Sequence, residues 1–198
     1  MTDGAVDLGF DGAVLAGGAS RRMGTDKAFI PVDGVPMVQR VATALTAAGA
    51  RRVVVIGGDQ ARLAGLGLDS VADPDPGLGP LAALATALAL LPGPTVVLPC
   101  DLTRPDATTI ARLVTALIDT PEAQVALPWT PPGQPIDVLS SAWRSSALIP
   151  ARRLLAAGVR APRVLVAELV VAEVSGLDSA TIVDADRPED LPPTGGPA

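Results

Sequence analysis

The sequence predicts an α/β protein, a three-layer α/β/α sandwich built around a mostly parallel, mixed sheet. Short apolar runs alternate along the chain with segments of helical periodicity, which is the order of β-α-β units. The runs "AVLA" (13–16), "VVVI" (53–56) and "VVLP" (96–99) are apolar at every position. Strands of a parallel sheet covered by helices on both faces have this character.

The individual elements follow from local patterns. Apolar residues at three- and four-residue steps from Val38 to Ala48, followed by Gly49, predict a helix over 35–49. The stretch "TPPGQP" (130–135) predicts a hairpin between two strands, so the sheet is expected to be mixed. The other expected helices span 78–91, 105–119 and 142–157, and the expected strands span 12–18, 51–58, 69–73, 95–101, 123–129, 135–141 and 180–186.

The length of the chain favours one domain. A chain of 198 residues has room for one sizeable core, and Ala, Leu and Val supply most of its 48% apolar residues. We therefore expect a single domain over residues 1–191 with an aliphatic core. The closing stretch "LPPTGGPA" has nothing to bury, so residues 192–198 are expected to be a disordered tail.

Composition excludes several classes of function. The net charge of −6 argues against a protein that binds nucleic acid by neutralising its phosphates. The chain has no histidine and one cysteine, Cys100, which excludes a Ser-His-Asp triad, His-ligated zinc and an internal disulfide framework. Any metal here is expected to be a hard cation bound through oxygen.

The N-terminal stretch "MTDGAVDLGFDG" carries acids where a secretory signal carries lysine or arginine, so we expect a cytoplasmic protein. The longest apolar run, from Leu81 to Leu91, is about half the length that spans a bilayer. It predicts a buried helix and no membrane segment.

A glycine-rich stretch, "VLAGGASRRMGTDK" (14–27), follows the first expected strand. Its spacing fits neither the G-x-x-x-x-G-K-[ST] loop nor the G-x-G-x-x-G loop of nucleotide-binding proteins. Paired glycines still let backbone N–H groups approach an anion, and Arg21, Arg22 and Lys27 could neutralise a polyphosphate. Composition alone leaves two readings equally open, a phosphate-binding loop and a solvated loop with surface arginines.

Asp101, in "PCD" (99–101), ends a buried strand. A carboxylate at that position could hold Mg²⁺, or it could cap the following helix or turn, and taken alone the segment favours the cap. Since the loops that begin at Gly17, Asp73 and Asp101 each follow an expected strand, they should open on the same edge of the sheet.

Two further stretches carry clustered acids and turn residues. In "ADPDPGLGPLAAL" (72–84), Gly77 and Gly79 lead into a helix whose N-terminus could meet an anion or the edge of a nucleotide, or the segment could be a turn and nothing more. In "DADRPEDL" (184–191), Asp184 and Asp186 could join Asp101 at a metal, although the spacing favours a solvated helix start.

Taken in order, these four stretches resemble a nucleotidyltransferase family, the one that includes molybdenum cofactor guanylyltransferase. The family pattern L-A-G-G-x-S-x-R-M-G-x-D-K matches residues 15–27, and "DPDPGLGPLA", "PCD" and "RPEDL" agree in order and approximate spacing. The resemblance covers most of the chain and implies a Rossmann-like nucleotidyltransferase fold.

The activity that the resemblance implies is transfer of GMP from GTP to molybdopterin, the molybdenum cofactor precursor, with Mg²⁺ as cofactor and release of pyrophosphate. Its partners would be GTP and molybdopterin, with no nucleic acid and no membrane, and transient contact with cofactor-delivery proteins stays open. The resemblance assigns Leu15, Ala16, Gly17 and Gly18 to the nucleotide through backbone contacts, Arg22 and Lys27 to its phosphates, Asp73 to the nucleoside side and Asp101 to the metal, with Arg22, Lys27 and Asp101 as the catalytic residues.

Three departures from the family concern selectivity. "GGD" (57–59) stands where members often carry asparagine, Gln134-Pro135 replaces a frequent His-Pro, and Asp184-Ala185-Asp186 replaces the usual Asn-x-Asn. They leave open a transferase that uses CTP or a different phosphorylated acceptor, and a non-catalytic relative that binds the nucleotide only. The oligomeric state stays open as well.

Overall fold

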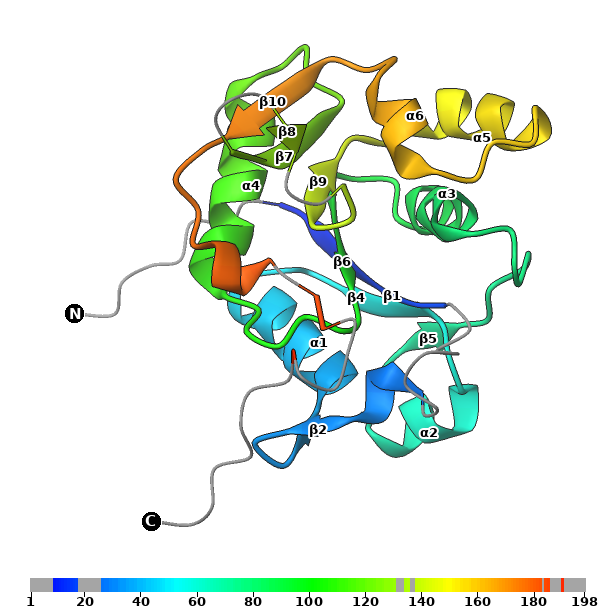
Figure 1. Ribbon diagram of the computed structural model, residues 1–198, viewed down its shortest axis with the longest axis vertical. Helices are drawn as coiled ribbons and strands as arrows, with labels where there is room; N and C mark the ends of the chain where they lie inside the picture. The colour runs from blue at the N-terminus through cyan, green and yellow to red at the C-terminus, as the bar shows by residue number, and fades with distance from the viewer. Residues whose placement is uncertain are drawn as a thin grey trace.

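A mixed β-sheet forms the middle layer of the molecule (Figure 1). The computed structural model describes residues 9–17, 26–130, 134–135, 138–182, 184–185 and 190. Over these residues the strands lie in the order β10-β7-β9-β6-β1-β4-β5, and β8 pairs with β7. The bounds of the strands are β1 Asp11–Ala16, β4 Val53–Gly57, β5 Ser70–Val71, β6 Thr95–Pro99, β7 Val125–Thr130, β8 Gln134–Pro135, β9 Ser141–Trp143 and β10 Val171–Val174.

The sheet is mostly parallel. β1 pairs in parallel with β4 on one side and with β6 on the other, so that Leu15 lies between Ile56 and Pro99. β5 continues the parallel set beyond β4, and β10 runs parallel to β7 at the far edge. Because β9 is antiparallel to both β6 and β7, the sheet is mixed, as predicted.

Helices cover both faces of the sheet (Figure 1). α1 (Met37–Ala47), α2 (Gln60–Gly65) and α4 (Ala107–Asp119) contribute to one apolar cluster, and α3 (Pro80–Leu90), α5 (Leu148–Ala156) and α6 (Pro162–Val166) contribute to the other. Neighbouring strand residues alternate between these clusters, with Val14 in the first and Leu15 in the second. Strands that are buried on both faces must be apolar throughout, which confirms the predicted three-layer sandwich.

The run from Leu81 to Leu91 forms most of α3, and most of its residues are buried, as predicted. Of the helices in the described part of the chain, none has the length and apolar character needed to cross a membrane. The predicted hairpin is also confirmed, since Trp129 of β7 pairs antiparallel with Pro135 of β8.

The expected helix over 142–157 begins too early. Trp143 belongs to β9, where it is fully buried and its indole Nε1 donates a hydrogen bond to Oγ of Ser141 at 2.6 Å. A 3₁₀ helix, η2 (Ser145–Ala147), then leads into α5. The expected strand over 135–141 is divided correspondingly, with β8 at its start and the first residue of β9 at its end.

The expected strand over 180–186 is wrong. Residues Ser179–Thr181 form a 3₁₀ helix, η3, because the carboxylate of Asp178 accepts a hydrogen bond from the N–H of Ala180 and caps it. The only pairing that the described part of this segment makes is an isolated bridge between Asp184 and Leu102. The strand at the edge of the sheet is β10 instead, where Ala172 and Val174 are buried and Glu173 is exposed.

The order in which strands are added to the sheet reverses at β1. From β1 it proceeds through α1 to β4 and through α2 to β5, and then α3 returns it to β6 on the other side of β1. The carboxyl ends of β1 and β6 therefore flank a topological switch point. Ligands of open α/β sheets bind in the crevice at such a point, so the topology places a site beyond Ala16 and Pro99.

Candidate functional site

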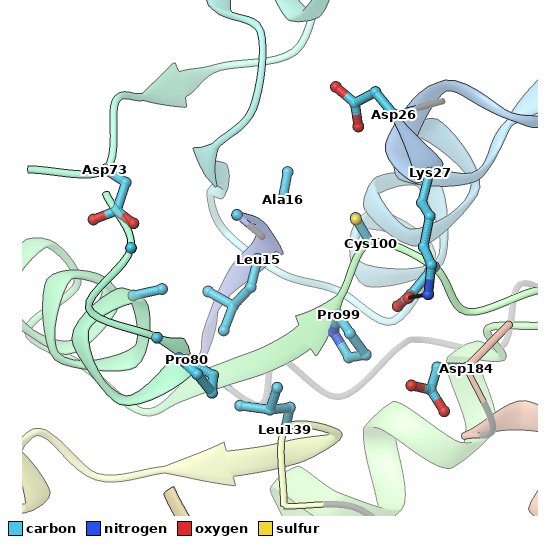
Figure 2. Close-up of a pocket in the computed structure, with 15 residues that line it drawn as sticks. Leu15, Ala16, Asp26, Lys27, Asp73, Pro80, Pro99, Cys100, Leu139 and Asp184 are labelled. Atoms are coloured by element: carbon cyan, nitrogen blue, oxygen red, sulfur yellow. Dashed lines mark hydrogen bonds and ion pairs between the residues drawn. The ribbon is translucent and has the colours of Figure 1, made fainter. Parts of the chain in front are cut away.

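A cavity of about 540 Å³ lies at the switch point (Figure 2). This volume is within the range of small-molecule binding sites. The loops that follow β1, β5 and β6 all contribute to it, which confirms that the segments beginning at Gly17, Asp73 and Asp101 open on one edge. The lining residues are Leu15, Ala16, Gly17, Asp26, Lys27, Asp73, Gly77, Gly79, Pro80, Ala83, Pro99, Cys100, Asp101, Leu139 and Asp184.

An ion pair stands at one end of the cavity. Nζ of Lys27 lies 3.2 Å from Oδ2 of Asp101, and each side chain is 14% exposed. The helix that follows Asp101 is capped by another residue, since Asp106 accepts a hydrogen bond from the N–H of Thr109 at 2.8 Å at the start of α4. Asp101 therefore does not cap α4, contrary to the helix cap considered for it, and it lines the cavity.

Lys27 is held by the short helix that contains it, η1 (Lys27–Phe29). Asp26 caps η1 by accepting a hydrogen bond from the N–H of Ala28 at 3.2 Å. At the other end of η1, the guanidinium of Arg62 lies over the Phe29 ring, 3.7 Å from its centre, which joins η1 to α2 by a cation–π contact. The position of the ammonium group therefore depends on contacts on both sides of it.

Asp101 is held by backbone hydrogen bonds from two directions. The N–H of Cys100 donates to the carbonyl of Leu15 at 3.1 Å, and the N–H of Ala185 donates to the carbonyl of Asp101 at 3.0 Å. The bridge between Leu102 and Asp184 extends the second contact. Residues 184 and 185 thus contact the loop after β6, and Asp184 is exposed at the cavity. Asp186 lies outside the described residues.

Asp73 stands across the strand ends from Lys27 and Asp184 (Figure 2). Its Oδ1 accepts a hydrogen bond from the N–H of Asp75 at 3.0 Å, so the turn predicted for this segment is present. Its other oxygen, Oδ2, lies 3.7 Å from the position that a Cβ on Gly17 would occupy. Asp73 therefore closes a turn and also faces the end of β1.

The start of α3 is already hydrogen-bonded within the protein. Pro80 has no N–H, the N–H of Leu81 donates to the carbonyl of Arg160 at 3.2 Å, and the N–H of Ala82 donates to the carbonyl of Gly79 at 3.1 Å. This first turn offers few donors to an anion. Of the readings considered for this segment, contact of Gly77 and Gly79 with the edge of a ligand fits the structure, because both glycines line the cavity.

"GGD" (57–59) packs against the end of β1. A Cβ on Gly57 would lie 3.3 Å from Cα and N of Gly17, and a Cβ on Gly58 would lie 3.2 Å from Cβ of Ala16. Asp59 caps α2 by accepting hydrogen bonds from the N–H groups of Ala61 and Arg62. None of the three lines the cavity, so their role here is to pack closely against the backbone of the site.

Cys100 also lines the cavity, between Pro99 and Asp101. Burial raises the pKa of its thiol, and the carboxylates of Asp101 and Asp26 raise that pKa further. The thiol is therefore protonated and a poor nucleophile at neutral pH. Sequence reasoning gave Cys100 no role in the site, and the structure makes it part of the wall.

Several expected site residues lie outside the described residues. These are Gly18, Arg21 and Arg22. The side chain of Gln134 also lies outside the described part of the structure. Leu15, Ala16, Gly17, Lys27, Asp73 and Asp101 are brought together as expected. Sequence reasoning gave no role to Asp26, Pro99, Cys100 or Leu139; Asp26 and Cys100 each adjoin a predicted site residue, while nothing in the local pattern around Leu139 marks it.

The donor set fits a magnesium ion that is completed by a ligand. No group of three Asp, Glu, His or Cys side chains able to hold a metal occurs in the described part of the chain. Mg²⁺ in phosphate-binding sites takes one or two carboxylates together with phosphate oxygens and water. Asp101 and Asp184 at one cavity suit that requirement.

An α/β sheet with a cavity at its switch point, lined in part by a lysine and carboxylates, defines an α/β protein that binds its ligand at the carboxyl ends of the strands. Residues 12–173 match the MobA-like NTP transferase domain, so the chain belongs to that family. Two relatives illustrate the similarity. "Molybdenum cofactor guanylyltransferase" of Xanthomonas euvesicatoria is 41% identical over 105 residues, 52% of each chain. "Probable molybdenum cofactor guanylyltransferase" of Chloroflexus aggregans is 33% identical over 170 residues, 83% of this chain and 79% of the relative.

The lengths of these matches differ, and the chain matches about half the length of the Xanthomonas relative. Among solved structures, "Molybdopterin-guanine dinucleotide biosynthesis protein A" from Archaeoglobus fulgidus superimposes with a TM-score of 0.74 and 21% identity, over 91% of this chain and 94% of that one. A nucleotidyl transferase from Methanothermobacter thermautotrophicus has a TM-score of 0.72 and 18% identity, over 91% and 93%. At these identities the likeness concerns the fold.

Proposed function

We propose that the protein transfers GMP from GTP to molybdopterin, with Mg²⁺ as cofactor and pyrophosphate as the second product. The observation that carries this proposal is the Lys27–Asp101 pair at the switch-point cavity of a MobA-like NTP transferase domain. It supports a site for a nucleoside triphosphate and a divalent cation. The names of the relatives from Xanthomonas and Chloroflexus supply the choice of guanosine and of the acceptor.

The nucleotide would lie across the ends of β1 and β6. Asp73, Gly77 and Gly79 would border the nucleoside, and the backbone of Leu15 to Gly17 would run beside it. Lys27 and Asp101, which lie across the cavity, would face the phosphates (Figure 2).

The reaction needs positioning and charge neutralisation more than acid–base chemistry. A terminal phosphate oxygen of the acceptor attacks the α-phosphorus of GTP, a new P–O bond forms, and the bond from the α-phosphorus to the pyrophosphate oxygen breaks. The attacking oxygen is already anionic, so a chain without histidine loses nothing. Lys27 would neutralise charge on the phosphates, and Asp101 would hold Mg²⁺, which supplies electrostatic stabilisation of the leaving and attacking oxygens.

The direct test is incubation of the protein with Mg²⁺, GTP and molybdopterin, followed by measurement of released pyrophosphate. We expect release that depends on all three components. No release under conditions in which an active guanylyltransferase works would overturn the proposal. GTP binding without turnover would indicate a non-catalytic relative instead.

Nucleotide choice can be tested separately from the acceptor. The shift in melting temperature with GTP, CTP, ATP and UTP, each with Mg²⁺, ranks the four nucleotides. We expect GTP to give the largest shift. Because "GGD" (57–59) does not line the cavity, it provides no side chain that selects a base, and a clear preference for CTP would reject the guanylyl assignment.

The proposal includes a cytoplasmic location, where nucleoside triphosphates and Mg²⁺ are available. The unpaired Cys100 is consistent with a reducing compartment. Cell fractionation with antibodies against the native protein tests this, and recovery of the protein in the extracytoplasmic fraction would contradict it.

A further inference from the structure

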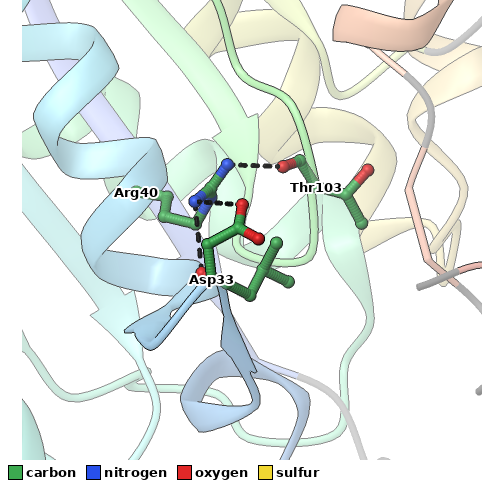
Figure 3. A network of polar contacts seen from close by, with 4 residues as sticks. Asp33, Arg40 and Thr103 are labelled. Atoms are coloured by element: carbon green, nitrogen blue, oxygen red, sulfur yellow. Dashed lines mark hydrogen bonds and ion pairs between the residues drawn. The ribbon is translucent and has the colours of Figure 1, made fainter. Parts of the chain in front are cut away.

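Arg40 of α1 connects two segments that are distant in the sequence (Figure 3). Its Nη1 donates to the carbonyl of Val32 at 3.2 Å and to Oδ2 of Asp33 at 3.4 Å. Its Nη2 donates to the carbonyl of Thr103 at 3.2 Å. One planar guanidinium group therefore holds both segments at once, which the single ammonium group of a lysine does less well.

Each of these segments carries one member of the Lys27–Asp101 pair. Val32 and Asp33 belong to the hairpin of β2 (Pro31–Val32) and β3 (Val35–Pro36), which directly follows the 3₁₀ helix of Lys27. Thr103 lies two residues beyond Asp101 in the loop after β6. Arg40 thus joins the segment that contains the ammonium group to the segment that contains the carboxylate.

The hairpin that Arg40 contacts has a tight turn and is bonded to α1. Asp33 and Gly34 both have positive φ, 51° and 79°, as in the tight two-residue turns that suit β-hairpins. The N–H of Met37 at the start of α1 donates to the carbonyl of Ile30 at 3.0 Å, just before the hairpin begins. The hairpin is therefore tied to α1 at its base and to Arg40 at its turn.

The burial of Arg40 has an unfavourable effect on folding stability. The side chain is 25% exposed, and its Nε is buried with no hydrogen-bond partner among the described residues. A buried polar atom without a partner destabilises a fold. The ion pair with Asp33 offsets little of this, because Asp33 is 68% exposed. An apolar side chain would avoid the cost of the buried Nε.

We propose that Arg40 is a positioning residue that sets the separation of Lys27 and Asp101. The inference rests on the proposed function, since it assigns to that separation the placing of a divalent cation against the phosphates. Arg40 does not line the cavity, so it acts through the two segments that it joins. A misplacement of about 1 Å at reacting groups can lower a rate by about a hundredfold.

The test compares Arg40→Met and Arg40→Lys with a matched variant, Arg112→Met. Arg112 of α4 makes the same kind of contact elsewhere: its Nη1 donates to the carbonyl of Gly176 at 2.8 Å and its Nη2 to that of Ser175 at 2.7 Å. Neither Arg112 nor its partners line the cavity. Both variants therefore lose an arginine that donates to backbone carbonyls of a loop, but Arg112 is exposed and contacts one loop away from the cavity, whereas Arg40 is partly buried and contacts two segments.

Four quantities are measured on each full-length variant: the melting temperature, Mn²⁺ binding by electron paramagnetic resonance in the presence of GTP, and both kcat and KM for GTP in pyrophosphate release. We expect Arg40→Met to weaken Mn²⁺ binding about tenfold and to lower kcat about tenfold to a hundredfold, with little change in KM for GTP. Arg40→Lys should fall between Arg40→Met and wild type, and Arg112→Met should change only the melting temperature.

A positioning role is overturned if Arg40→Met and Arg112→Met lower the melting temperature alike and leave Mn²⁺ binding and kcat unchanged. Wild-type protein that binds no Mn²⁺ with GTP overturns it too. If wild-type protein binds Mn²⁺ but releases no pyrophosphate, the proposed transfer reaction fails while the metal-binding comparison still decides the role of Arg40. Should Arg40→Met not fold, Arg40→Lys supplies the same comparison.

Discussion

Nζ of Lys27 lies 3.2 Å from Oδ2 of Asp101, although the two residues are 74 positions apart in the chain. The pair joins the segment after β1 to the loop after β6 at the point where the order in which strands are added to the sheet reverses. The lysine neutralises the carboxylate that we propose as a metal ligand. Binding of Mg²⁺ and the nucleotide would then replace this contact, so that Asp101 contacts the cation and Lys27 contacts the phosphates.

Removal of Lys27 should strengthen metal binding and weaken catalysis. In Lys27→Met, no ammonium group competes with a cation for Asp101, so Mn²⁺ affinity without nucleotide should rise about twofold to fivefold, the range of a partly exposed ion pair. Pyrophosphate release should fall about a hundredfold or more, because phosphate charge is no longer stabilised. Electron paramagnetic resonance and a turnover assay measure the two effects. Unchanged or lower Mn²⁺ affinity would show that Lys27 does not compete for the carboxylate.

Substitution of Asp101 should separate turnover from nucleotide binding. Asp101→Asn keeps the shape of the side chain and removes its charge, so we expect pyrophosphate release to fall about a hundredfold to a thousandfold. Nucleotide affinity without metal should stay within about threefold of wild type, since Lys27 is retained. Calorimetry with GTP and the turnover assay measure both. Asp119→Asn, at an exposed position at the end of α4, is the control and should change neither nucleotide affinity nor pyrophosphate release. An equal loss of pyrophosphate release in both variants would argue against a metal ligand at Asp101.

The close packing of Gly57 against Gly17 can be tested with a second glycine that has the same φ angle. Gly57 and Gly158 both have φ near 84°, but a Cβ on Gly158 meets nothing within 4 Å, whereas a Cβ on Gly57 meets Gly17 at 3.3 Å. Alanine at either position should cost about 1–2 kcal/mol of unfolding free energy, because a left-handed conformation disfavours side chains. Only Gly57→Ala should also weaken GTP binding, by about tenfold.

Urea unfolding and GTP titration of the two glycine variants provide the measurements. Equal stability loss with weaker GTP binding in Gly57→Ala alone supports contact of the nucleotide with the Ala16–Gly17 backbone. Unchanged GTP binding in Gly57→Ala would show that the loop after β1 tolerates displacement or lies away from the nucleotide.

The thiol of Cys100 should resist alkylation. Its pKa in the folded protein is raised above the ordinary value of about 9, and only the thiolate reacts. At pH 8 to 9, iodoacetamide should label folded protein at least about tenfold more slowly than urea-unfolded protein, as followed by mass spectrometry. The same shift keeps the folded thiol protonated where the unfolded thiol ionises. The contribution of the Cys100 thiol to the free energy of unfolding is therefore fully present below about pH 9, and it falls as the pH rises further. Equal labelling rates in the two states would contradict the raised pKa.

Much of the fold could be predicted from local pattern, because the longer elements carry their own signals. β1, β4 and β6 are apolar on both sides and were identified from that fact alone, as was the buried helix α3. Two short elements, α2 and β10, could not be predicted in this way, since they have too few residues to display a period. Trp143 was assigned to a helix because its burial in β9, between β6 and β7, depends on strands that adjoin it only in space.

The site shows the same division. The sequence by itself determined that polar loops follow apolar strands, and parallel strands bring those loops to one edge, so Gly17, Asp73 and Asp101 could be placed together in advance. Only the tertiary structure decided between the two roles open to Asp101: Asp106 caps α4, whereas Asp101 pairs with Lys27. A cap is a contact across two or three residues, so spacing along the chain can suggest one. The Lys27–Asp101 pair depends instead on the order of strands in the sheet and on the contacts that hold both loops, which spacing along the chain does not contain.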